Sequence, residues 1–163
     1  MLPAVSFYEI VLAVHIMAAV VAFGVTFAFP IMFAVAARHD PRGLPLLHRV
    51  EYTIERMLIN PALLLVLLAG IYLASKGHFW SDFFVQWGLA VAIVIGALVG
   101  AVMIPTAKRA EQAAARDLTA TAGGEVALSE EYRTLTRRLS TVGSLLSLLV
   151  LVTIYFMVTH TGT

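Results

Sequence analysis

Four long stretches of the chain are apolar and carry no charged side chain. They run over residues 10–37, 57–75, 83–107 and from 139 to the C-terminus. About 20 residues of α-helix cross a hydrocarbon core of roughly 30 Å, so each stretch is long enough to span a bilayer. We predict spans at about 8–37, 57–75, 83–107 and 139–160. The expected fold is an all-α integral membrane four-helix bundle, formed as one domain by residues 1–163.

The polar links between these spans also have helical patterns. Before the second span, apolar residues recur at helical spacing and predict a short amphipathic helix: Leu46, Leu47, Val50, Ile54, Met57 and Leu58. Residues 108–118 predict a helical extension of the third span, and residues 121–124 a turn. Ser129 is a candidate N-cap for the helix that leads into the fourth span. We expect a helical hairpin between the third and fourth spans that projects into the cytoplasm.

Composition supports a membrane protein. Hydrophobic residues make up 60% of the chain, charged residues 13%, and the mean hydropathy is +0.90. The formal net charge is only +1, so nothing indicates nucleic acid as a partner. Cysteine is absent, which excludes disulfides, thiolate ligands and iron–sulfur clusters. Redox chemistry would therefore need a bound cofactor.

The distribution of basic residues predicts the orientation. The first link carries Arg38, Arg42, Arg49 and Arg56, and the third carries Lys108, Arg109, Arg116, Arg133, Arg137 and Arg138. The middle link has only Lys76. By the positive-inside rule the two basic links are cytoplasmic and both termini face outward. We expect a multi-pass protein of the bacterial cytoplasmic (inner) membrane, with the lipid bilayer as its first partner.

Small residues form rows at helical spacing in three spans: Ala18, Ala22 and Thr26; Gly96 and Gly100; Ser140 and Ser144, with Gly143 and Ser147. Small side chains let membrane helices approach closely, so these rows predict a compact bundle. Rows that faced outward would instead mediate a homo-oligomer or contact with another membrane protein.

His15 is the one histidine or charged residue well inside a predicted span. A polar group at that depth needs a partner and is expected to face the bundle interior. Its helical neighbours Ala18, Ala19 and Ala22 leave room for a flat cofactor. The simpler interpretation is a neutral histidine that is hydrogen-bonded across the bundle to a hydroxyl or a carbonyl.

Arg56 and Asn60 stand four residues apart at the cytoplasmic start of the second span, where helical spacing predicts one face. A guanidinium there is suited to clamp a carboxylate or phosphate of a ligand. The alternative is an arginine that extends to the lipid headgroups, with Pro61 only starting or kinking the helix.

A looser metal site in the outer half is a third candidate. The predicted topology brings several possible ligands to the same side of the membrane as His15. Together with His15, some of them would bind copper or another transition metal: His78, His160, Glu9, Asp82 and Met157. His39 and His48 fall in the first basic link, where we expect them to be solvated. No pair of carboxylates lies inside an apolar span, which disfavours a proton-driven carrier.

The first two spans resemble a known superfamily. AVHIMAAVVAFGVTFAFP places His15 fifteen residues before Pro30, and ERMLINPALLLVLLAGIYL contains Arg56-x-x-x-Asn60-Pro61-Ala62. Both segments resemble the superfamily of the haem-containing, flavin-free membrane protoporphyrinogen oxidases and the copper-resistance D-type membrane proteins. The likeness is to its uncharacterised bacterial members, which are predicted integral membrane proteins, and it covers the first three spans.

The resemblance implies a bound haem b. It makes His15 an axial ligand of the iron, Arg56 a partner of a propionate and Asn60 a residue of the same pocket. The oxidases place a lysine soon after a tryptophan in the third span, whereas Gln86 to Ala90 contain none. The implied function is therefore a small b-type haem protein, in electron transfer or porphyrin oxidation. The alternatives are the binding or transport of a metal or small lipophilic molecule, and a non-catalytic partner protein.

Overall fold

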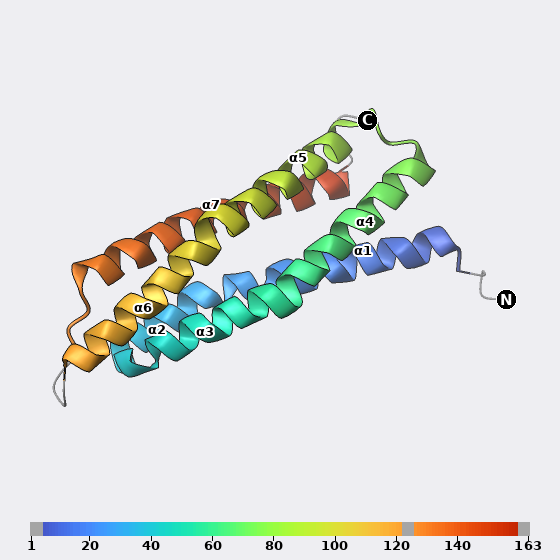
Figure 1. The fold of residues 1–163 in the computed structure, drawn as a ribbon. Coiled ribbons are helices and arrows are strands. Elements are labelled where there is room, and N and C mark those ends of the chain that lie inside the picture. The colour runs from blue at the N-terminus through green and yellow to red at the C-terminus, as the bar shows by residue number, and fades with distance from the viewer. Residues whose placement is uncertain (1–4, 122–125, 160–163) are drawn as a thin grey trace.

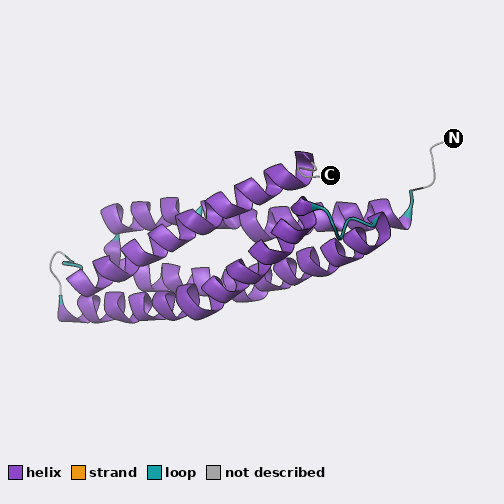
Figure 2. Ribbon diagram, turned by 90° about the horizontal axis from the view of Figure 1, so that it is seen from above, coloured by secondary structure: helices purple, strands orange, loops and turns teal. Residues whose placement is uncertain are grey.

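The computed structural model describes residues 5–121 and 126–159, and the described part is helical with short connections (Figures 1 and 2). The helices are α1 Phe7–Gly24, α2 Phe29–His39, α3 Leu44–Ile54, α4 Asn60–Gly77, α5 Phe83–Leu98, α6 Ile104–Ala120 and α7 Glu130–Thr159. They join into four long helical runs that are apolar enough to cross a membrane: Phe7–His39, Pro41–Gly77, Phe83–Ala120 and Glu130–Thr159. This confirms the all-α fold, and the amphipathic helix and the helical extension are confirmed as α3 and α6.

The bundle consists of two helix pairs. α1 packs along α4, and α5 packs along α7, while α3 and α6 join the two pairs. Figure 1 shows the α2–α3 turn and the α6–α7 connection at one end, which we call the basic end. The α4–α5 loop lies at the other end, where Phe7 contacts Tyr72 and Phe83 contacts Phe156. The two basic links therefore share one end, as the charge pattern predicts; which side of the membrane this end faces stays a prediction.

Three of the four runs contain an irregular turn that a proline follows. The 3-10 turn Val25–Phe27 precedes Pro30 at the start of α2. The π-helical turns Glu55–Ile59 and Val99–Met103 precede Pro61 and Pro105, at the starts of α4 and α6. A proline lacks the amide proton that a regular helix would use, and the chain adjusts its local winding accordingly.

The tightest packing lies at the basic end. Leu44 on α3, Ala110 and Ala114 on α6, and Tyr132 on α7 belong to one buried cluster, and none of these four residues is more than 4% exposed. Ser129 caps α7, since its hydroxyl accepts the amide of Tyr132 at 3.3 Å. The predicted cap is therefore confirmed. The helical hairpin does not project alone, because it packs against α3; most of the predicted turn at residues 121–124 lies outside the described residues.

Candidate functional site

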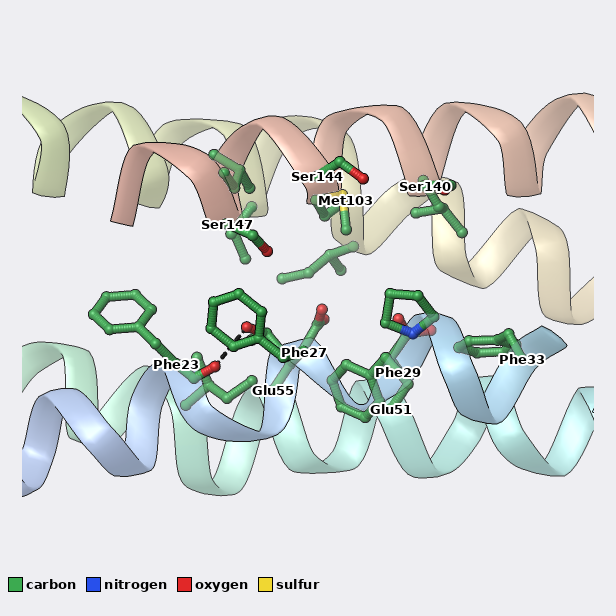
Figure 3. Close-up of a pocket in the computed structure, with 18 of the residues that line it drawn as sticks. Phe23, Phe27, Phe29, Phe33, Glu51, Glu55, Met103, Ser140, Ser144 and Ser147 are labelled. Carbon is green, nitrogen blue, oxygen red and sulfur yellow. Dashed lines mark hydrogen bonds between the residues drawn. The ribbon is translucent and has the colours of Figure 1, made fainter. Parts of the chain in front are cut away.

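A cleft of about 870 Å³ separates the α1–α4 pair from the α5–α7 pair. Its walls are mostly aromatic and aliphatic, and four phenylalanines from the first run stand on one side (Figure 3): Phe23, Phe27, Phe29 and Phe33. It extends from the middle of the spans to the polar beginning of α7, where Arg133 and Arg137 belong to its lining. We call it the interhelical cleft.

Rows of small residues keep the cleft open. The lining includes both glycines of the third span and four small residues of the fourth: Gly96, Gly100, Ser140, Gly143, Ser144 and Ser147. A methyl group added at Gly96 or Gly100 would meet nothing within 4 Å, apart from its own helix and chain neighbours. The expectation that these rows draw helices together is therefore wrong for the third span. The row on α1 does pack, since Ala18 and Ala22 are buried.

Two carboxylates enter the cleft from the wall formed by α3 and the following π-helical turn. Glu51 and Glu55 lie one helical turn apart, and they are 6% and 7% exposed. Figure 3 shows both side chains directed toward α7. The Oε2 atom of Glu55 is buried and forms no hydrogen bond within the described residues. A buried carboxylate oxygen without a partner is costly, which makes Glu55 the most unusual group of the site.

Glu51, in contrast, belongs to a hydrogen-bonded chain. His48 Nδ1 lies 3.2 Å from Glu51 Oε2, and His48 Nε2 lies 3.3 Å from the Tyr132 hydroxyl of α7. His48 is 2% exposed and packs against Phe33, with ring centroids 4.4 Å apart and ring planes tilted by 35°. The expectation that His48 is solvated is therefore wrong. His39 is exposed at the end of α2, as expected.

Tyr132 indicates the direction of the hydrogen bonds between Tyr132, His48 and Glu51. It lies in the polar first part of α7, before the apolar span. Burial, with smaller contributions from the charges of Glu51 and Asp117, raises the pKa of Tyr132 to about 12. The phenol therefore keeps its proton and can donate a hydrogen bond to His48 Nε2. With a neutral imidazole, Nδ1 then carries the ring proton and donates a hydrogen bond to Glu51 Oε2. Glu51 thus has a hydrogen-bond partner, whereas Glu55 Oε2 has none among the described residues.

Sequence reasoning overlooked these residues although their spacing was informative. His48, Glu51 and Glu55 follow one another at i, i+3 and i+7, which defines one face of a helix. The opposite face is apolar and outward: Leu46, Val50 and Met57 are 65%, 38% and 74% exposed. In a membrane protein the apolar face of a helix can face lipid, so the polar face enters the bundle. The absence of carboxylates from the apolar spans therefore does not exclude proton-linked chemistry.

The structure gives His15 a hydrogen-bond partner across the α1–α4 pair, which both of its predicted roles allow. Its Nδ1 donates a hydrogen bond to the Val66 carbonyl of α4 at 2.9 Å, which leaves Nε2 as the unprotonated nitrogen. The ring lies against Gly70, where an added methyl carbon would be 3.2 Å from His15 Cε1. His15 is not among the residues that line the interhelical cleft.

Only one of Arg56 and Asn60 belongs to the cleft. Both are exposed, but Asn60 is part of the lining and Arg56 is not. The π-helical turn Glu55–Ile59 lies at this point of the chain, and in it the Asn60 amide bonds the Glu55 carbonyl five residues back. Of the three residues assigned to a haem pocket, only Asn60 lines the cleft.

The looser metal site finds no support in the described residues. Within residues 5–121 and 126–159, no three His, Cys, Asp or Glu side chains are placed to bind a metal ion. Glu9 accepts the Ser6 amide at 2.8 Å and so caps α1. His78 is exposed and ends α4 with a left-handed backbone, and His160 lies outside the described residues.

Fold and cleft together define an integral membrane protein of four helical runs with an internal polar patch. The chain belongs to the family described as predicted integral membrane protein (DUF2269), which it matches over residues 9–161. No curated protein and no solved structure matches the chain. The family match supports a predicted integral membrane protein and does not show membership of the oxidase and copper-resistance superfamily.

Proposed function

We propose that this membrane protein binds a small lipophilic molecule in the interhelical cleft, as a binding protein or as part of a transport cycle. The observation that carries the proposal is the cleft itself, about 870 Å³ in size and lined mainly by apolar side chains. Ligand sites in proteins have this size and character, with a few polar groups that orient the ligand. Glu51, Glu55 and Asn60 are such groups here.

The proposal is tested by filling the cleft. Gly96→Leu places a side chain in open space within the cleft, whereas Ala97→Leu is the matched control, since Ala97 is exposed and outside the lining. The probe is N-phenyl-1-naphthylamine, a neutral dye whose fluorescence rises in apolar surroundings. Binding is measured with the full chain in nanodiscs, against empty nanodiscs. We expect Gly96→Leu to weaken binding about tenfold or more, a loss of about 1.4 kcal/mol, and Ala97→Leu to change it little.

Saturable binding that Gly96→Leu leaves unchanged would contradict the proposal. A second copy of the chain is the competing occupant, because an open groove between helices can accept another helix. It would appear as a dimer in detergent that Gly96→Leu dissociates, with no dye binding.

The second candidate function is haem b binding at His15, in electron transfer or porphyrin oxidation. The observation that favours it is the hydrogen bond of His15 Nδ1 to Val66, because an axial histidine needs such a partner and presents Nε2 to iron. The three residues of the resemblance fit one haem poorly, since Arg56 and His15 are both outside the cleft. We therefore derive no reaction from it. The test is a Soret band in protein from haem-replete cells that disappears in His15→Ala; a colourless protein, unchanged by added haemin, contradicts it.

A further inference from the structure

We propose that the ligand of the interhelical cleft is a lipophilic organic cation, and that its positive group binds Glu55 in exchange for a proton. This inference rests on the proposed function, because it requires the cleft to be a ligand site. It adds the chemical class of the ligand and the group that recognises it.

The first step is the state of Glu55. Glu55 is 7% exposed, its side chain is directed into the cleft, and its buried Oε2 atom forms no hydrogen bond within the described residues. An ionised carboxylate in apolar surroundings needs a counter-charge or a proton. Either one can occupy Glu55, and both cannot do so at once.

The second step is the charge around Glu55. Glu51 stands one turn away and repels a second negative charge, so a cation at Glu55 is attracted by both carboxylates. The other titratable groups of the lining are His48 on α3 and Tyr132, Arg133 and Arg137 on α7. Both arginines are exposed, where solvent and headgroups screen them. Apart from Glu55, no charged residue lines the cleft from the other elements, which are α1, α2, α4, α5, α6 and the turns between them.

The third step is the character of the walls, which favours an organic cation over an inorganic one. Phe23 and Phe27 stand on the wall beside Glu55 in Figure 3, and aromatic faces attract cations. A hydrated metal ion would need several oxygen or nitrogen ligands, and no such group of three occurs within residues 5–121 and 126–159. A quaternary or protonated amine with apolar substituents suits both the carboxylate and the phenylalanines.

The exchange balances as one proton for one cation. The protonated carboxyl of Glu55 loses its proton to bulk water, and the resulting carboxylate pairs with the cation. No bond to carbon forms or breaks, and nothing is oxidised. Binding therefore becomes tighter as the pH rises through the titration of Glu55, up to about tenfold per pH unit.

The experiment uses tetraphenylphosphonium, a permanent lipophilic cation, and the full chain in nanodiscs. Isothermal titration calorimetry in buffers of different ionisation enthalpy counts the protons released. We expect up to one proton per bound cation. Glu55→Gln should weaken cation binding at least tenfold and abolish its pH dependence, and Glu55→Asp should keep the pH dependence. Glu111→Gln is the matched control, because Glu111 pairs with Arg49 outside the cleft.

Each failure has its own signature. Cation binding that is independent of pH, or equal in Glu55→Gln, overturns the exchange at Glu55. If the neutral dye binds and the cation does not, the inference that the ligand is a cation is wrong, and the proposed function still holds. If neither probe binds, the proposed function fails as well. Unchanged dye binding in Glu55→Gln shows that this variant is folded, and Glu55→Asp provides the second variant if it is not.

Discussion

Tyr132 and His48 are 84 residues apart in the chain, and they meet across the bundle with 3.3 Å between the phenol oxygen and Nε2. This contact joins α7 to α3 at the basic end of the interhelical cleft. Through the second ring nitrogen of His48 it also determines the position of the Glu51 carboxylate. One hydrogen-bonded chain thus links the two halves of the molecule and leaves Glu55 outside it.

Tyr132→Phe should destabilise the protein by about 1–3 kcal/mol, because it removes the phenol and leaves a buried ring nitrogen of His48 without a donor. The measurement is thermal or denaturant unfolding in detergent. Tyr155→Phe is the control, since that side chain is 61% exposed in the fourth span. Equal losses in the two variants would contradict the role of the contact.

Gly70→Ala should destabilise the α1–α4 pair. The added methyl would lie 3.2 Å from Cε1 and 3.6 Å from Nδ1 of His15, so the imidazole, which bonds Val66, must move by a few tenths of an ångström. We expect a loss of about 1–3 kcal/mol.

Gly24→Ala is the matched control, as its methyl group meets no atom within 4 Å outside its own helix and chain neighbours, and its backbone is already helical. It should be neutral or stabilise by about 0.4–1 kcal/mol. The same unfolding midpoint for both variants would mean that His15 is not held against Gly70.

Thr153→Val should loosen α5 from α7. Trp87 Nε1 donates to Thr153 Oγ1 at 3.0 Å, and valine keeps the shape of threonine but cannot accept this bond. Hydrogen bonds between membrane helices contribute about 0.6 kcal/mol on average, so the expected loss is about 0.5–1.5 kcal/mol. Thr53→Val is the control, because its hydroxyl bonds within its own helix. Indole emission at a changed wavelength would accompany the loss, and an unchanged midpoint and spectrum would refute the contact.

The orientation is testable because the chain contains no cysteine. Single cysteines at Gly43, in the α2–α3 turn, and at Ser81, in the α4–α5 loop, lie at opposite ends of the bundle. A maleimide that does not cross membranes should label Ser81→Cys in intact cells, and should label Gly43→Cys only after the membrane is opened. The reverse pattern would place the basic loops outside.

The four spans were predictable because bilayer thickness dictates both their length and their lack of charge. The continuous helices beyond them were predictable too, since Ser129 and the amphipathic spacing of α3 are local signals. Local signals of this kind depend on neighbours in the chain and need no knowledge of the partner helix.

The cleft and its carboxylates were not predictable in the same way. Rows of small residues occur both where helices touch and where they enclose space. Ala22 is buried against another helix and Gly96 borders open space, and only the position of the neighbouring helix distinguishes the two cases. The face of α3 that enters the bundle was ambiguous because lipid accepts apolar side chains as readily as a protein core does. The π-helical turn Glu55–Ile59, just before Asn60, is also not indicated by spacing alone.

The irregular turns before Pro30, Pro61 and Pro105 have a mechanical consequence. Each of the three irregular turns contributes a residue to the lining of the cleft: Phe27, Glu55 and Val99. A helix bends most easily where its hydrogen-bond ladder is interrupted, so bending compliance in three of the four runs is concentrated alongside the cleft. Small changes of angle at these turns alter the width of the cleft, which suits it to molecules of differing girth.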